Sequence, residues 1–310
     1  MGWACSGSRR PRRCKYMTEY SGELRFVTYL SPGIPQRLFE AVVDHVRRTL
    51  RCERASLQVE TRVSGPERGT QDPFSSGEYD VGFMCSPSFV WLRELKPPPV
   101  ELLGVAPVFG DARASGRPVY FCDVVVRRDG TGRSFAELRG CSWAFNDLCS
   151  LSGYYSLLYK LAEMDADESF FGRVFRSGSH LNSIESVVRG EADAAAIDSN
   201  VLNMRLREVP ALREKLCVIE SWGPFPIQPV VVRSALPAGL KERLRASFLT
   251  MDADPRHRLA LSEFDLKRFV SVTDEDYRGL WGEPEGSGGD ERRSAILFAT
   301  ISGRKTSGRA

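Results

Sequence analysis

The sequence of 310 residues lacks any apolar run that approaches the ~18 residues a membrane-spanning helix needs. It has only three histidines, and none of its eight cysteines forms a C-x-x-C pair, so no zinc site is expected. With 42% hydrophobic and 27% charged residues, the composition is that of an ordinary globular chain. We therefore expect neither a fibre, nor a membrane protein, nor a wholly disordered chain, and we expect no metal and no other cofactor.

The net charge of +3 is unevenly distributed along the chain. Residues 1–16 hold five cations and no acid, and residues 283–310 carry a net charge of +1, which leaves −3 for residues 17–282. A faintly acidic body is a poor match for nucleic acid, whose binding needs a basic face. We therefore expect no nucleic-acid partner.

Both ends of the sequence are expected to be disordered extensions, a basic leader at 1–18 and a tail rich in Gly, Ser and charge at 283–310. Residues 1–20 contain no apolar stretch of the kind a secretory signal has, so the sequence as it stands indicates a cytoplasmic protein. Met1-Gly2 with Ser6 matches a loose acylation pattern, and a plain extension before Met17 is the alternative.

The cysteines favour a reducing compartment. Cys122 and Cys217 each lie among strand-forming apolar residues, where a cysteine acts as a small hydrophobe. Free thiols are therefore expected for most of the eight, which suits a reducing environment better than an oxidising one.

Strand-like and helix-like segments alternate along the body. The first group has strands near 24–30, 56–63, 80–84 and 100–109 with helices at 36–50 and 88–95. The second group has strands near 119–127, 141–145, 175–178, 194–197 and 216–220 with helices at 134–137, 152–163 and 181–189. A strand at 229–233 and a helix at 236–248 resume the first group. The alternation predicts an α/β protein whose sheets are mixed but mostly parallel, with helices on both faces.

The chain leaves the first group near 117 and returns to it near 222, which predicts two lobes joined by a hinge of two crossing strands. The first lobe would comprise 19–117 with 222–282, and the second 118–221. Ligands of open α/β sheets bind at the carboxyl ends of the strands, and in a two-lobed protein these ends face a shared cleft. Hinge closure would follow binding.

A polar loop at 146–154 follows one predicted strand and opens a helix. Its hydroxyl residues and glycine leave N–H groups and seryl oxygens at the positive end of the helix dipole, a cradle for phosphate, phosphonate, sulfonate or carboxylate. The alternative is that Ser150 or Ser152 merely caps the helix.

A second strand-to-helix segment, 177–180, ends in His180. In the first helical turn His180 could donate to an anion, although a lone histidine there is also common on surfaces. His45 is expected on the polar side of its helix and His257 in a charged loop, so neither is expected to be its partner.

These segments resemble the phosphate- and phosphonate-type substrate-binding proteins of ABC transporters. The similar motifs follow the order of that family and span roughly 24–250. They are Asp80-Val81-Gly82-Phe83-Met84, Asn146-Asp147 with Ser150-x-Ser152-Gly153-Tyr154, Gly178-Ser179-His180, Gly190-Glu191-Ala192-Asp193 with Asp198, and Trp222-Gly223-Pro224-Phe225-Pro226 before 229–233.

The resemblance implies a type II periplasmic-binding-protein fold that holds a small anion between its lobes, without catalysis, as a monomer that serves an ABC permease. It implies that Ser150, Ser152 and the Gly153 backbone hold the oxyanion, with His180 as a further donor. It also implies that Asp198 faces a ligand amine or hydroxyl and that Ser86 contributes from the other lobe. The full set of implied ligand-binding residues is Ser86, Asn146, Ser150, Ser152, Gly153, Tyr154, His180, Asp198 and Gln228.

The sequence departs from the pattern of that family in several places. Leu151 stands where a hydroxyl residue is common, and Gln228 where an acid often binds a ligand amine. These two departures leave aminoalkyl phosphonates and other small anions equally open. The segment 64–78 is poor in helix formers where the family has a helix. The resemblance implies a periplasmic or extracellular location, whereas the sequence as it stands shows no signal sequence, so the location stays open.

Two other functions remain open from the sequence. The same fold without a transporter would make a cytosolic anion sensor. Alternatively, Ser152, His180 and Asp198 could serve as nucleophile, base and orienter of a hydrolase, although the G-x-S-x-G elbow of many such enzymes is absent.

Overall fold

The structure is a computed structural model that describes residues 22–130 and 132–280. The expected leader at 1–18, with its acylation pattern, and the expected tail at 283–310 lie outside the described residues. Within the described part, no helix combines the length and the apolar character needed to cross a membrane. The six cysteines of that part, Cys52, Cys85, Cys122, Cys141, Cys149 and Cys217, are free thiols.

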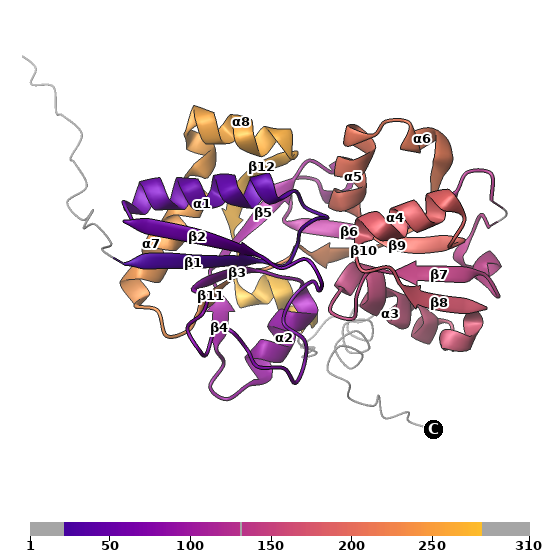
Figure 1. Cartoon of the computed structure of the whole chain (residues 1–310), viewed down its shortest axis with the longest axis horizontal. Helices are drawn as coiled ribbons and strands as arrows, with labels where there is room; N and C mark the ends of the chain where they lie inside the picture. The colour runs from indigo at the N-terminus through magenta and orange to yellow at the C-terminus, as the bar shows by residue number, and fades with distance from the viewer. Residues whose placement is uncertain (1–21, 131, 281–310) are drawn as a thin grey trace, which may run out of the picture.

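One five-stranded sheet is built from both ends of the described chain (Figure 1). Its helix α1 and its helix α2 cover opposite faces. The strand order is β2 (Arg54–Val59), β1 (Glu23–Thr28), β3 (Val81–Phe83), β11 (Val230–Arg233), β4 (Val100–Leu102). The helices are α1 (Gln36–Leu50), α2 (Ser86–Glu94), α7 (Ala238–Leu249) and α8 (Pro255–Glu263).

A second five-stranded sheet is formed by the middle of the chain, with α4 and α3 on opposite faces (Figure 1). The strand order is β10 (Leu216–Pro226), β6 (Val119–Arg127), β9 (Ala194–Asp198), β7 (Ser142–Phe145), β8 (Arg173–Arg176). The helices are α3 (Ser156–Glu163), α4 (His180–Arg189), α5 (Ser199–Glu208) and α6 (Leu212–Lys215).

A two-stranded antiparallel sheet pairs β5 (Val105–Phe109) with β12 (Leu266–Ser271). The remaining elements are short turns of helix, of which the π-helical turn η3 matters for the site. They are η1 (Ala112–Ala114), η2 (Phe135–Leu138), η3 (Leu151–Tyr155), η4 (Glu168–Phe170), η5 (Met251–Ala253) and η6 (Asp274–Leu280).

Both large sheets are mixed, as expected, but parallel pairings do not form the majority. Strands β6 and β11 run antiparallel to both of their neighbours, while β1, β2 and β3, like β7, β8 and β9, are parallel. The reason is topological: β6 and β11 are the strands by which the chain enters the second sheet and re-enters the first. The α/β class and the two-lobed arrangement agree with the prediction.

The single strand expected at 100–109 is instead two strands in different sheets. Gly104 lies between them with φ of +75°, a left-handed conformation that glycine adopts without steric cost. The turn sends β5 away from β4 to pair with β12. This strand was not expected, because its apolar residues Leu266, Phe269 and Val270 do not alternate and its Lys267 and Arg268 are exposed. The segment 64–78 contains turns and no helix, consistent with its composition.

His45 and His257 form a buried pair, which corrects both expectations for these residues. His45 is buried on α1, and His257 lies in α8 and not in a loop. The two Nδ1 atoms are 3.0 Å apart, and His45 Nε2 lies 2.9 Å from the Ser247 carbonyl oxygen. Because that carbonyl can only accept, His45 donates from Nε2 and its Nδ1 is an acceptor. The hydrogen of His257 Nδ1 faces both this nitrogen and Asp254 Oδ2, which is 3.2 Å away. The pair is buried because α7 and α8 pack onto α1, a contact that could not be predicted from the sequence of α1.

Acid should destabilise the fold through this pair. Burial, assisted by the neighbouring His257, lowers the pKa of His45 below its ordinary value. The unfolded chain therefore takes up a proton at His45 more readily than the folded one. The free energy of unfolding is unaffected by this group above about pH 6.5 and decreases as the pH falls below that value, by at most about 1.4 kcal/mol per pH unit. Urea unfolding at pH 7.5 and 5.5 should show a smaller pH dependence in His45→Gln than in the parent protein. Equal dependence in the two proteins would contradict this assignment.

Candidate functional site

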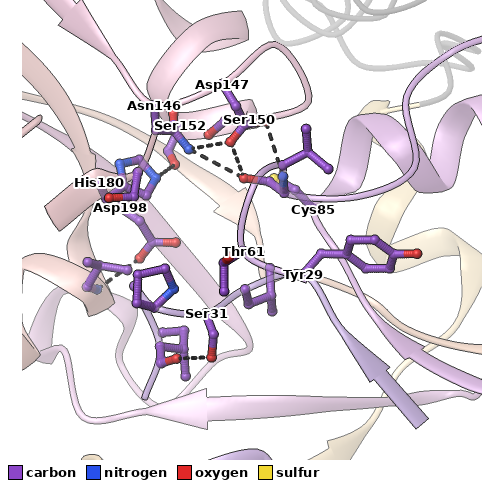
Figure 2. A pocket seen from close by; sticks show the side chains of 18 of the residues that line it. Tyr29, Ser31, Thr61, Cys85, Asn146, Asp147, Ser150, Ser152, His180 and Asp198 are labelled. Carbon is purple, nitrogen blue, oxygen red and sulfur yellow. Dashed lines mark hydrogen bonds between the residues drawn. The ribbon is translucent and has the colours of Figure 1, made fainter. Parts of the chain in front are cut away.

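A cavity of about 40 Å³ lies where the two large sheets face each other (Figure 2). The segments that line it follow β1, β2 and β3 on one side and β7, β8 and β9 on the other, so the carboxyl ends of these strands meet there. The lining comprises residues 29–34 with Thr61, Val63, Ser64 and Cys85, and Asn146, Asp147, Ser150, Ser152, Gly178, Ser179, His180, Asp198, Val201 and Gln228.

Six of the nine residues expected at the site line this cavity. They are Asn146, Ser150, Ser152, His180, Asp198 and Gln228. The other three lie just behind the lining. Ser86 is buried at the start of α2 next to Cys85, Gly153 packs against Asn146, and the Tyr154 ring lies 5.1 Å from the Phe145 ring.

Gly153 is required by its close approach to Asn146. A Cβ atom at 153 would overlap Asn146 Oδ1, a buried oxygen that accepts no hydrogen bond within the described residues. The Asn146 amide Nδ2 donates to Asp147 Oδ2 over 2.9 Å. Glycine at 153 therefore allows Asn146 to lie against the loop, where a larger residue would clash with its carbonyl oxygen.

Ser152 and His180 form a hydrogen-bonded pair in the cavity (Figure 2). Ser152 Oγ and His180 Nε2 are 3.1 Å apart, and His180 Nδ1 is buried without a partner in the described part of the chain. Burial lowers the pKa of His180 to about 4, so the imidazole is neutral at pH 7. The hydroxyl and the neutral ring carry two polar hydrogens and share one, which leaves one donor for a ligand.

Ser150 both caps η3 and lines the cavity. Its Oγ accepts the Gly153 N–H over 3.0 Å, so the capping alternative is correct for this residue. The Leu151 N–H is occupied by Cys85 Sγ at 3.2 Å. Ser152 instead points its hydroxyl at His180, so it is the seryl group of this loop that the cavity uses as a donor or acceptor.

Asp198 ends β9 and caps α5. Its Oδ1 accepts the Asn200 N–H over 2.8 Å and the Val201 N–H over 3.3 Å, and its Oδ2 accepts from Gln228 Nε2. Burial raises the pKa of Asp198 to about 6, so the carboxylate is mostly ionised at pH 7. The bond to Gln228 was not anticipated from the sequence, because the two residues are 30 positions apart and come from different segments.

Asp147 joins the two sides of the cleft and was missed as a functional residue. Its carboxylate accepts from Ser64 N over 3.2 Å, Ser64 Oγ over 2.5 Å and Cys149 N over 2.8 Å. Burial raises its pKa even though these donors favour the ionised form. Arg176 Nη2 also donates across the cleft to the Arg62 carbonyl over 2.8 Å, so the two halves are in contact at Arg62 as well as at Ser64.

The cavity has donors and acids but no cationic side chain in its lining. None of the residues that line it, all of them described, is Lys or Arg. The Ser152–His180 pair is not extended into a hydrolase triad, because His180 Nδ1 has no partner among the described residues and Asp198 bonds to Asn200, Val201 and Gln228. Such a site is built to recognise a small polar group by hydrogen bonds.

Comparison with solved structures identifies similar folds. A binding-protein component of an ABC phosphonate transporter from Pseudomonas aeruginosa is 16% identical, covers 92% of this chain and 98% of its own, and gives a TM-score of 0.70. PhnD1 from Prochlorococcus marinus in complex with methylphosphonate is 16% identical over 83% and 94% of the two chains, with a TM-score of 0.65. A Xanthomonas citri protein bound to ATP is 18% identical over 91% and 98%, with a TM-score of 0.61.

A family model confirms the resemblance seen in the sequence motifs. The model describes the periplasmic substrate-binding protein of phosphonate ABC transporters and matches residues 25–277, which include every strand from β2 to β12. The chain therefore belongs to the family of periplasmic phosphonate-binding proteins of ABC transporters.

Proposed function

We propose that this protein binds a small phosphonate or phosphate anion in the cavity between its two sheets and delivers it unchanged to an ABC permease. The observation that carries the proposal is the Ser152–His180 pair, which offers a donor inside the polar cavity. The methylphosphonate complex of the Prochlorococcus protein, which shares the fold, supports the same class of ligand. We propose that the protein acts as a monomer and has no catalytic activity.

The size of the cavity supports a small headgroup. A volume of about 40 Å³ has room for roughly three water molecules, because a buried water occupies about 10–15 Å³ by the same measure. That space matches one phosphonate or phosphate group. A nucleotide such as the ATP of the Xanthomonas protein would need the two halves to separate.

We propose the two lobes that the sequence suggests, 19–117 with 222–282 and 118–221, but with the return boundary moved from 222 to the crossing at 226–230. The pairing of β10 with β6 reaches Pro226, and β11 begins in the other sheet at Val230. These pairings support a return crossing at 226–230, slightly beyond 222.

The acids of the cavity favour an anion that carries a proton. Asp147 already accepts several donors, whereas Asp198 Oδ2 has only Gln228 as its partner among the described residues and can accept one more hydrogen. The P–OH group of a phosphonate or phosphate monoanion can supply that hydrogen, and sulfate cannot. With no cation in the lining, an unprotonated dianion would meet an uncompensated carboxylate.

Removing the donor pair should weaken binding of methylphosphonate. The double variant Ser152→Ala, His180→Ala loses the hydrogen bond from this pair to the charged ligand, and such a bond is worth about 1.5–3 kcal/mol. It also loses the Ser152–His180 bond that orients the donor. Calorimetry at pH 7 should therefore show affinity reduced by at least about tenfold. Ser262→Ala, on the exposed face of α8, is the matched serine control and should leave affinity unchanged. Unchanged affinity in the double variant would refute the site assignment.

Discrimination against sulfate should depend on Asp198. At pH 7 methylphosphonate should bind at least about tenfold more tightly than sulfate, since one charge-assisted hydrogen bond separates them. In Asp198→Asn, which keeps an N-cap residue for α5, the ratio should fall toward one, because the amide can donate to sulfate. Competition calorimetry measures the ratio, with Asp129→Asn on the exposed surface as control. A ratio that survives Asp198→Asn would exclude this carboxylate as the discriminating group.

A further inference from the structure

A second cavity, of about 30 Å³, adjoins the polar one and lies in the lobe that contains the first sheet. Leu30, Ile34 and Gln228 line both cavities, so these three side chains form the wall between them. Apart from Gln228, every side chain in its lining is apolar. The rest of the lining comprises Leu38, Phe39, Val42, Phe83, Pro107, Phe109, Val230, Leu266 and Phe269.

The second cavity lies between helix α1, strand β3 and the paired strands β5 and β12. Helix α1 supplies Phe39, whose ring lies 5.0 Å from that of Phe83 on β3. Strands β5 and β12, which the break at Gly104 brings together, supply the opposite side. The Gln228 amide bonds to Asp198 on the polar side, and Gln228 also lines the apolar cavity.

We propose that the two cavities form one site, in which the polar part holds the oxyanion and the apolar part holds a short alkyl chain on the same ligand. The proposal rests on the proposed function, because it assigns the organic group of the oxyanion bound there. The ligand class is then an alkylphosphonate or an alkyl phosphate ester, with the chain entering past Leu30 and Ile34.

The size and chemistry of the second cavity limit that chain. Room for roughly two water molecules corresponds to about two or three carbon atoms. No Asp or Glu lines it, so a cationic tail would lose its hydration without gaining a counter-charge. An apolar chain instead gains about 0.8 kcal/mol per buried methylene, which is roughly a fourfold gain in affinity for each.

A ligand series on the unmodified protein tests the proposal. Calorimetry with methyl-, ethyl-, n-propyl- and n-pentylphosphonate should show affinity rising about fourfold per methylene up to propyl and no further gain at pentyl. 2-Aminoethylphosphonate, which has as many heavy atoms as n-propylphosphonate, should bind at least about tenfold more weakly than it. Equal or weaker binding of n-propylphosphonate relative to methylphosphonate would overturn the tail site while leaving the proposed function intact. Absence of binding by every phosphonate would instead overturn the proposed function itself.

A substitution that partly fills the apolar cavity provides the second test. Val42→Ile adds one methyl group inside the apolar cavity, whereas Val43→Ile makes the same change at a neighbouring buried residue that does not line it. Val42→Ile should lower n-propylphosphonate affinity severalfold and leave methylphosphonate affinity unchanged, and Val43→Ile should affect neither. Equal losses for both ligands, or losses in both variants, would contradict the assignment. If either variant failed to fold, as judged by thermal unfolding, the ligand series on the parent protein would still decide the question.

Discussion

The arrangement of the cleft depends on the buried carboxylate of Asp147. A charged group away from water is costly unless it accepts hydrogen bonds. Asp147 accepts them from Ser64, in the segment after β2 on the opposite side of the cleft, and from Cys149 in its own loop. The first contact holds the halves together. The second fixes the loop so that Ser150 reaches the Gly153 N–H and Ser152 faces His180. One group thus closes the cleft and also shapes it.

Much of the fold was predictable from the sequence where the spacing of the apolar residues reveals which face of a helix or strand is buried. Helix α1 has the expected bounds because Leu38, Val42, Val46 and Leu50 repeat at helical spacing, and β6 has them because its long apolar run is interrupted only by Asp123. The errors arise where tertiary contacts decide. His45 is buried by helices distant in sequence, and the strand at 100–109 is divided by one glycine whose conformation no periodicity reveals.

The site was predictable to the extent that its residues follow strands and precede helices. Asn146, Ser150, Ser152, His180 and Asp198 all occupy such positions and line the cavity. Ser64 and residues 29–34 were missed because they lie in turns that carry no motif, and the Asp198–Gln228 bond joins residues that only the sheet arrangement brings together. The apolar cavity could not have been predicted at all, since β12 was not recognised as a strand.

The lack of a cationic side chain in the lining of the polar cavity also has a kinetic consequence. Attraction between a basic pocket and an anion extends over the Debye length of about 8 Å at physiological ionic strength and speeds their encounter. Neutral donors act only at contact distance, so the donors of this lining give an approaching anion no such long-range attraction. Abundant inorganic anions then gain no long-range attraction from the lining, so selection among anions depends on the hydrogen bonds made inside the cavity.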